Sequence, residues 1–326
     1  MKNLNVYIMM LTVLMATLSA CNRDEIFERE HYKHVISIIS EADGAFNIFN
    51  EEHDPAADGD AEGFTDGYIA ASVGGSLITD QPITIHIVED APLLQEFNNS
   101  NFTLESYRYA RYLPANRYII DQPVINIPAG ERLGKMKIRV RADGLSPDSM
   151  YFIPFRVDRF SAYELNAQKN TVLYRVYLKN FWASAAAYQT TYYHRGFRYE
   201  VGTDNDPVPT IINKPVHPLT GNSVRIFAGN TPFSDEFEDI EKWAIRLSMD
   251  DEGRVTISPY SNDRNAMKVT QIDGDEEYPN VFKVMDDGWG NLYKTFLLYY
   301  EYVDPTDNLT YSIKEELRIG HQKTVI

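Results

Sequence analysis

The clearest signal for covalent chemistry in this sequence is Cys21, the only cysteine among 326 residues. It directly follows Leu18-Ser19-Ala20, and an apolar run from Val6 to Leu18 lies behind the basic residue Lys2. A charged start, a short apolar core and small residues before a cleavage point are typical of a secretory signal. We therefore predict that residues 1–20 are a lipoprotein signal peptide and that Cys21 is the lipidated first residue of the mature chain. The alternative is an ordinary secretory signal in which the cysteine has no role.

A second group of residues suits the stacking of sugar rings. Trp289 lies in the loop Asp286-Asp287-Gly288-Trp289-Gly290-Asn291, which has no apolar neighbours, and Tyr293 and Tyr299 lie on the outward face of the strand that follows. Flat aromatic rings bind the apolar faces of sugars with little loss of entropy, and glycines let a ligand approach the backbone. Trp289, Tyr293 and Tyr299 are therefore the candidate glycan-binding residues. The alternative is that Trp289 folds back over the open end of its β-sandwich. The inward face of the same strand is expected to carry Phe296, Leu298, Tyr300 and Tyr302.

Acidic residues are plentiful, but their placement argues against catalysis. The pairs Glu51-Glu52, Asp286-Asp287 and Glu315-Glu316 fall mostly in turns or at strand ends, where solvated charge is the usual role. Residues 180–326 are too few for a (β/α)₈ glycosidase barrel of about 250 residues. The sequence also lacks a Gly-x-Ser-x-Gly elbow, a P-loop and a dinucleotide fingerprint. We predict no catalytic residues, and a small hydrolase remains the third hypothesis.

The sequence predicts no metal site and no cofactor. Its 7 histidines are scattered, without the spacing of a zinc-binding helix. Asp204-Asn205-Asp206 and the segment from Asp273 to Glu277 offer the oxygen ligands that Ca²⁺ prefers. The alternative for both segments is a hydrated acidic turn.

Composition excludes several kinds of partner. Without residues 1–20 the chain has 30 basic and 47 acidic residues, a net charge of −17. Nucleic acid requires clustered Lys and Arg, so we predict no nucleic-acid partner. Adhesion to anionic lipid by charge alone is excluded for the same reason. A single cysteine also means that no disulfide holds the fold together.

Short strands separated by turns predict an all-β fold with two β-sandwich-like domains. After a polar tether over residues 21–32, the first domain covers residues 33–179 and contains clear period-2 alternation at Ile83, Ile85 and Ile87. A short helix is expected from Asp90-Ala91-Pro92, with Asn98-Asn99-Ser100-Asn101 ending it. An immunoglobulin-like topology is the natural expectation for such a domain.

The second domain, residues 180–326, is predicted to be a small antiparallel β-sandwich or barrel. Trp243 to Met249 alternates and meets Val255-Thr256-Ile257 across an acidic turn, which indicates a hairpin. Trp243 is expected in the core. The segment with Pro207, Pro209, Pro215 and Pro218 is predicted to be a loop, because proline cannot donate to a β-ladder.

Several turn-and-strand signatures resemble one family. They are Leu113-Pro114-x-x-x-Tyr118-x-Ile120, Ile127-Pro128-Ala129-Gly130-Glu131 and the stretch from Leu145 to Phe155. Together they are similar to the immunoglobulin-like N-terminal domain, of unknown function, of surface lipoproteins in Sus-like polysaccharide-utilisation systems. The segment from Asp287 to Phe296, with Leu317-Arg318, resembles the small β-rich domain that often follows it.

The resemblance implies a non-catalytic, glycan-binding lipoprotein, lipid-anchored in the outer membrane at the cell surface. Its expected partners are an oligosaccharide or polysaccharide, the membrane through the lipid, and an outer-membrane uptake complex. Acidic residues after Cys21, including Asp24 and Glu25, resemble the export signals of some surface lipoproteins, with a solvated linker as the alternative. The alternative function is a structural or interaction lipoprotein that binds a protein partner and no sugar.

Overall fold

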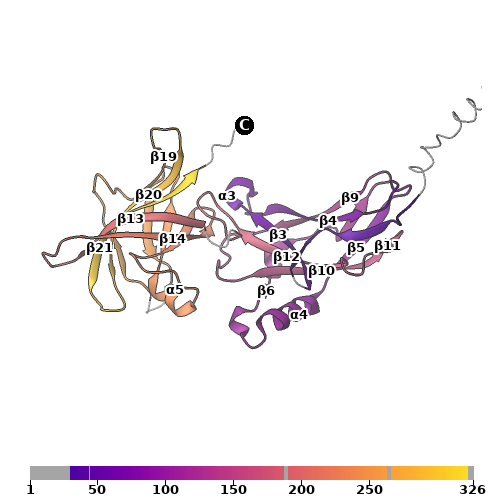
Figure 1. The fold of residues 1–326 in the computed structure, drawn as a ribbon, viewed down its shortest axis with the longest axis horizontal. Coiled ribbons are helices and arrows are strands. Elements are labelled where there is room, and N and C mark those ends of the chain that lie inside the picture. The colour runs from indigo at the N-terminus through magenta and orange to yellow at the C-terminus, as the bar shows by residue number, and fades with distance from the viewer. Residues whose placement is uncertain (1–29, 44, 187–189, 263–265, 322–326) are drawn as a thin grey trace, which may run out of the picture.

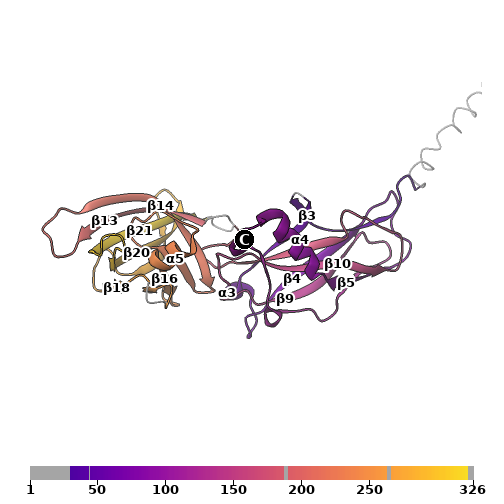
Figure 2. The same cartoon turned by 90° about the horizontal axis from the view of Figure 1, so that it is seen from below.

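The computed structural model describes residues 30–43, 45–186, 190–262 and 266–321. Cys21, the signal peptide and most of the tether lie outside the described residues. The predicted all-β, two-domain fold is confirmed: the two domains lie end to end, with the N-terminal strands in one and the C-terminal strands in the other (Figures 1 and 2). The immunoglobulin-like topology of the first domain stays a prediction.

The first domain contains two sheets that face each other. The five-stranded sheet has the order β11 (Glu164–Leu165), β1 (Val35–Ile38), β4 (Thr65–Val73), β9 (Leu133–Val140) and β7 (Tyr118–Ile119). The seven-stranded sheet has the order β2 (Glu41–Asp43), β3 (Phe46–His53), β12 (Thr171–Leu178), β10 (Tyr151–Phe160), β5 (Ile83–Glu89) and β8 (Val124–Ile127), with β6 (Arg111–Tyr112) paired to β10.

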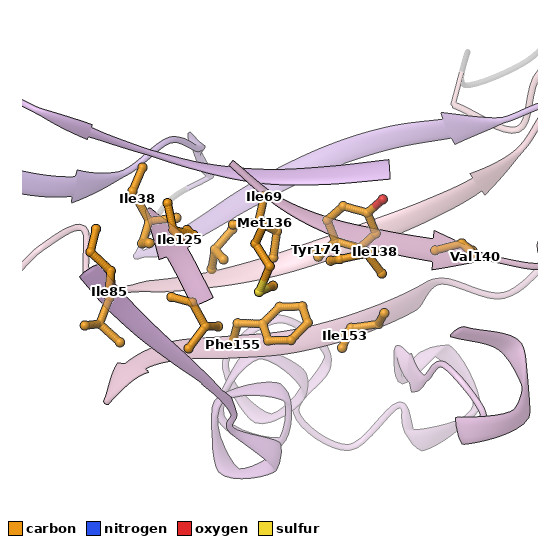
Figure 3. Close-up of a cluster of buried hydrophobic side chains, with 14 of the residues drawn as sticks. Ile38, Ile69, Ile85, Ile125, Met136, Ile138, Val140, Ile153, Phe155 and Tyr174 are labelled. Carbon is orange, nitrogen blue, oxygen red and sulfur yellow. The ribbon is translucent and has the colours of Figure 1, made fainter. Parts of the chain in front are cut away.

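Alternating apolar side chains from both sheets fill the space between them. Ile83, Ile85 and Ile87 of β5 are all at most 2% exposed, which confirms the predicted alternation. They meet Met136 and Ile138 of β9 in one continuous core (Figure 3). Burying a large aliphatic side chain contributes about 1.5–3 kcal/mol, so this core is the main source of stability in a chain without disulfides.

Helices are few and lie outside the sheets. They are α3 (Pro55–Asp58), α4 (Ala91–Phe102), α5 (Phe237–Trp243) and the 3₁₀ turns η1 (Ser106–Arg108) and η2 (Ala115–Arg117). Across the described residues, no helix is both long enough and apolar enough to cross a bilayer. The predicted end of α4 at Asn98-Asn99-Ser100-Asn101 is confirmed to within one residue, because the helix ends at Phe102. The Asn98 side chain is buried, and its Nδ2 and Oδ1 lie 2.9 and 2.8 Å from the carbonyl oxygen and the amide nitrogen of Ala110. Its polar groups are therefore satisfied inside the domain rather than at a helix end.

The second domain is a nearly closed antiparallel barrel. Its nine strands follow the order β17 (Val255–Pro259), β16 (Ala244–Met249), β15 (Ser223–Phe227), β14 (Val208–Thr220), β13 (Thr190–Glu200), β21 (Thr310–His321), β20 (Leu292–Val303) and β18 (Val269–Gln271), with β19 (Val281–Asp286) also paired to β20. The Ile257 amide of β17 donates to Gln271 Oε1 of β18 over 2.8 Å and links the two ends of the sheet. The predicted hairpin is confirmed as β16 and β17, whereas Trp243 ends α5 and is only partly buried.

Most of the proline-rich segment is strand β14 rather than the predicted loop, and of its four prolines only Pro207 lies outside the strand. Residues 208–216 of this strand pair with β13, and residues 217–220 pair with β15. Each part of the strand therefore has one unpaired edge. A proline is tolerated in a strand when its missing N–H would face such an edge or lie at a bulge. Pro209 and Pro215 lie in the part paired only with β13, and Pro218 lies at the register shift opposite β15.

The two domains are joined by direct polar contacts. Arg225 of β15 is fully buried and makes a bidentate ion pair with Asp148, in which Nη2 lies 2.7 Å from Oδ1. The Gly221 amide donates to Asp143 Oδ1 over 2.8 Å, and the Gly144 amide donates to the Leu219 carbonyl oxygen over 3.1 Å. Breaking a buried pair by removing one partner is costly, so these contacts favour one arrangement of the domains.

A buried histidine in the first domain makes its stability depend on pH. His53 Nδ1 lies 2.7 Å from Thr65 Oγ1 and Nε2 lies 3.1 Å from the Tyr174 hydroxyl. Burial lowers the pKa of His53 to about 4. The unfolded pKa of His53 is 6.5. At pH values between 6.5 and about 4, the unfolded chain therefore binds a proton at this position that the folded chain does not bind. Its contribution to stability is present above pH 6.5 and is lost as pH falls.

We expect His53→Gln to reduce the pH dependence of unfolding. The free energy of unfolding of the wild type should fall between pH 6.5 and pH 4.5, with His53 contributing about 2–3 kcal/mol of that fall. The variant, which has no titrating group at this position, should show a correspondingly smaller fall. Urea unfolding at several pH values measures the effect. Equal pH slopes in the two proteins would contradict it.

Candidate functional site

Trp289 occupies a fixed loop between β19 and β20. Asp286 Oδ1 accepts from the Gly288 amide over 2.7 Å, and Asp287 Oδ1 accepts from the Trp289 amide over 2.8 Å. Gly288 and Gly290 have φ values of 84° and 89°, which side-chain-bearing residues rarely adopt. The acidic and glycine residues around Trp289 therefore shape the loop.

The Trp289 side chain projects into solvent. It is 90% exposed, the second most exposed of the large hydrophobic side chains among the described residues. The alternative that Trp289 folds back over the end of its domain is therefore wrong. The ring is held on a hydrogen-bonded loop and is free to contact a ligand.

Tyr293 and Tyr299 lie on the outer side of the barrel, where β13 adds two more rings. In the sheet register, Arg318 of β21 lies opposite both Tyr193 and Thr295, and Lys314 lies opposite both Phe197 and Tyr299. Residues directly opposite each other in a sheet share a face. The intervening residues of each strand point inward, as predicted for Phe296, Leu298, Tyr300 and Tyr302, which are all at most 1% exposed. We call the rings of Tyr193, Phe197, Tyr293 and Tyr299, with the cations of Arg318 and Lys314, the aromatic face.

The rings of the aromatic face alternate with charged groups. The Arg318 guanidinium lies 4.4 Å from the centre of the Tyr293 ring, and Lys314 Nζ lies 4.9 Å from that of Tyr299. Between these pairs, Arg195 Nη2 donates to Glu316 Oε2 over 2.7 Å. Both hydrogen-bond donors and acceptors therefore stand beside the rings, as recognition of hydroxyl groups requires.

The structure brings Tyr293 and Tyr299 together on one face and leaves Trp289 in the loop that leads into the same strand. Sequence reasoning missed Tyr193 and Phe197, which are 48% and 44% exposed. The signal was present in the alternation of Tyr193, Arg195 and Phe197 with Tyr192, His194 and Gly196. The alternation extends over the whole of β13, which is one continuous strand from Thr190 to Glu200.

Directly beneath the aromatic face lies a buried ionic network. Glu315 Oε2 lies 2.6 Å from Lys214 Nζ and 2.8 Å from His194 Nε2, and all three side chains are at most 1% exposed. The Tyr300 hydroxyl donates to Glu315 Oε1 over 2.9 Å and accepts from the Gly229 amide over 2.9 Å. The network joins strands β13, β14, β20 and β21, which fixes the backbone that carries the outer rings.

Charge pairing keeps Glu315 ionised inside the barrel. Burial by itself raises the pKa of this carboxyl, but Lys214 and His194 outweigh burial and lower the pKa to about 2. The pKa of His194 is lowered by burial and by Lys214. Glu315 is therefore a charged structural group that interacts with its buried partners.

The described part of the chain contains no evident metal centre. No group of three His, Cys, Asp or Glu side chains there is arranged to hold a metal ion. Asp275, one of the candidate calcium ligands, instead bonds to Lys314, which lowers the pKa of its carboxyl. A cavity of about 620 Å³ at the β18–β20 edge of the barrel has Glu301 as its only acidic lining residue among those described, whereas glycoside hydrolysis usually needs two carboxylates.

Family models match both domains of the chain. One model, for an N-terminal domain, matches residues 32–164, and the other, for a C-terminal domain, matches residues 170–318. The chain is therefore similar to proteins in which two such domains follow each other. A search of curated proteins finds no match.

Solved structures from Bacteroides share this two-domain fold. A protein of unknown function from Bacteroides ovatus is 17% identical with a TM-score of 0.57, and the alignment covers 89% of this chain and 95% of that one. An auxiliary nutrient-binding protein from Bacteroides thetaiotaomicron is 15% identical with a TM-score of 0.53, covering 86% of this chain and 94% of that one. At these identities the likeness establishes the fold.

We expect Glu315→Gln to destabilise the barrel, because it leaves the Lys214 charge buried without its counter-ion. Removing one partner of a buried pair typically costs about 3–5 kcal/mol. The double variant Glu315→Gln with Lys214→Met removes both charges and should be more stable than Glu315→Gln alone. Urea unfolding of the three proteins at pH 7 tests this.

The network also predicts a specific acid response. The pKa of Glu315 in the folded chain is below its unfolded value of 4.5. Its contribution to the free energy of unfolding is therefore present above pH 4.5 and is lost as pH falls toward about 2. The double variant should lack this part of the acid destabilisation. A double variant that is less stable than Glu315→Gln alone would contradict the coupling of Glu315 and Lys214.

Proposed function

We propose that the chain is a non-catalytic, glycan-binding lipoprotein of the outer membrane, which captures or presents oligosaccharide to a Sus-like uptake system. The aromatic face is the observation that carries this proposal. Tyr193 and Phe197 are roughly half exposed on a rigid sheet, and Trp289 is fully presented on the adjacent loop. Isolated exposed aromatics are common, but rings aligned across neighbouring strands form a surface.

The chemistry of the aromatic face suits a sugar chain. The apolar faces of sugar rings stack on Tyr, Phe and Trp at low entropic cost. Their hydroxyls need polar partners, and Arg195, whose side chain is 58% exposed, offers donors beside the rings. The open, shallow form of a sheet face suits the side of a long chain rather than its end.

Likeness to the nutrient-binding protein of Bacteroides thetaiotaomicron supports a binding role, because the alignment extends over both domains. The position of the chain start agrees with a surface anchor. The described chain begins at the end of the first domain that lies away from the barrel (Figures 1 and 2). A lipid on Cys21 would hold that end at the membrane and leave the barrel extended outward.

A second candidate function is the binding of a protein partner. The β13–β14 hairpin exposes Val201, Val208 and Ile211, which are 44%, 59% and 67% exposed. Apolar side chains gathered at one end of a domain are typical of interaction sites. Ile211→Glu should weaken such an interaction and leave glycan retention unchanged.

We expect Trp289→Ala and Tyr293→Ala each to weaken glycan retention about tenfold, equivalent to about 1.4 kcal/mol. The measurement is affinity electrophoresis of the soluble protein lacking residues 1–21 against a broad panel of polysaccharides. Tyr68→Ala is the matched control, because Lys135 Nζ lies 5.5 Å from the centre of the Tyr68 ring on the first domain. Wild-type retention in both barrel variants, with lowered stability, would mean that the rings are structural.

Anchoring is tested separately. The wild type should partition into the detergent phase, because two or more acyl chains give stable membrane attachment at about 0.8 kcal/mol per buried CH₂. Cys21→Ala should move the protein to the aqueous phase. Unchanged partitioning of this variant would refute lipidation at Cys21.

A further inference from the structure

A cavity of about 270 Å³ lies between the two domains, separate from the aromatic face. The first domain lines it with the turn from Leu145 to Tyr151 and with the end of β12. The second domain contributes Ala185, His217, Phe233 and Asp235. Ligand sites occur preferentially at domain junctions, where two surfaces enclose a small molecule.

Two flat aromatic side chains from different domains line this interdomain cavity. Tyr177 of β12 has the Arg175 guanidinium 4.5 Å from the centre of its ring. Phe233 stacks on His217 with a centroid distance of 5.5 Å and an interplanar angle of 25°. A ring-shaped ligand in the cavity would therefore have an aromatic side chain from each domain beside it.

The polar groups of the cavity favour an uncharged ligand. Its charged lining consists of Arg108, Arg175, Asp148 and Asp235, so cations and anions balance. Arg108 Nη1 donates to Glu105 over 2.8 Å, and Asp148 is held by Arg225. An ionic ligand would therefore gain no net attraction from this lining.

His217 adds an unsatisfied polar atom. Its Nε2 is buried and has no hydrogen-bond partner among the described residues. Burial, followed by the positive charge of Arg225, lowers the pKa of His217 to about 4, so the imidazole is neutral at pH 7. A buried polar group without a partner costs about 1–3 kcal/mol, so this neutral imidazole lines the cavity at some cost in stability.

The cavity is formed before any ligand arrives. The bidentate pair of Arg225 and Asp148 fixes the two domains beside it, and Asp148 itself lines the cavity. A volume of about 270 Å³ equals roughly nine waters at about 30 Å³ each. That space suits a single sugar ring rather than a long chain.

We propose that the interdomain cavity is a second carbohydrate site, which binds one neutral sugar ring, free or at the end of a chain, between Tyr177 and Phe233. The ligand class rests on the proposed function, whereas the site itself is independent of the aromatic face. The aromatic face takes the side of a chain, and the interdomain cavity takes its end.

Titration calorimetry of the full soluble chain with methyl glycosides of neutral hexoses tests the proposal, with methyl glucuronoside as the anionic comparison. We expect at least one neutral glycoside to bind and the anionic one to bind at least tenfold more weakly. Phe233→Ala should weaken binding tenfold or more. Phe237→Ala is the matched control, because Phe237 is a nearby phenylalanine that is 70% exposed and does not line the cavity.

Ala185→Phe provides a second variant that fills the cavity without removing any of its polar groups, and urea unfolding verifies that each variant is folded. Loss of binding in both cavity variants, with retention in Phe237→Ala and Tyr293→Ala, supports the proposal. No binding by any neutral glycoside at millimolar concentration, or full affinity in folded cavity variants, overturns it. Neither of these results would change polysaccharide retention on the aromatic face. The proposal for the interdomain cavity can therefore be wrong while the proposal for the aromatic face is right.

Discussion

The barrel depends on one buried carboxylate. Glu315 contacts Lys214, His194 and Tyr300 at once, in an interior where an unpaired charge would be costly. Because side chains alternate along a strand, the same segments that meet at Glu315 also present Arg195, Lys314 and the outer rings. The ionic interior thus fixes the register of the aromatic exterior, since a shift of one residue would exchange the two faces.

A second buried charge has the same role between the domains. Arg225 is fully enclosed, and its strongest partner, Asp148, comes from the other domain. A hydrophobic junction would tolerate sliding, whereas a bidentate pair between a guanidinium and a carboxylate is directional. The wall of the interdomain cavity formed by Phe233 therefore keeps a defined position relative to Tyr177. In a chain with a single cysteine, such pairs provide the specificity that disulfides provide in many small domains.

The fold class and the faces of the strongest strands were predictable, because alternation such as Ile83, Ile85 and Ile87 has one interpretation. The prediction of a loop at the prolines of β14 was wrong, because the sequence does not reveal which edge of a strand is unpaired. The end of α4 was predictable from the run of Asn and Ser residues, but the burial of Asn98 against Ala110 was not. Of the aromatic face, the rings on β20 were predictable from local pattern. The rings on β13 also follow from alternation once β13 is taken as one continuous strand, whereas the interdomain cavity depends on contacts between segments that no local pattern encodes.

Trp289 illustrates how the candidate site differs from the rest of the surface. Leaving its ring 90% exposed forgoes a burial that is worth about 2–3 kcal/mol for a large apolar side chain. The loop does not recover this through packing, because its order comes from hydrogen bonds to Asp286 and Asp287. The loop is already ordered, so a ligand that covers the ring gains most of that free energy without having to order the backbone. An exposed ring on a fixed loop therefore contributes little to folding and is well placed for binding. For this reason the functional proposal is tested first at Trp289 and Tyr293.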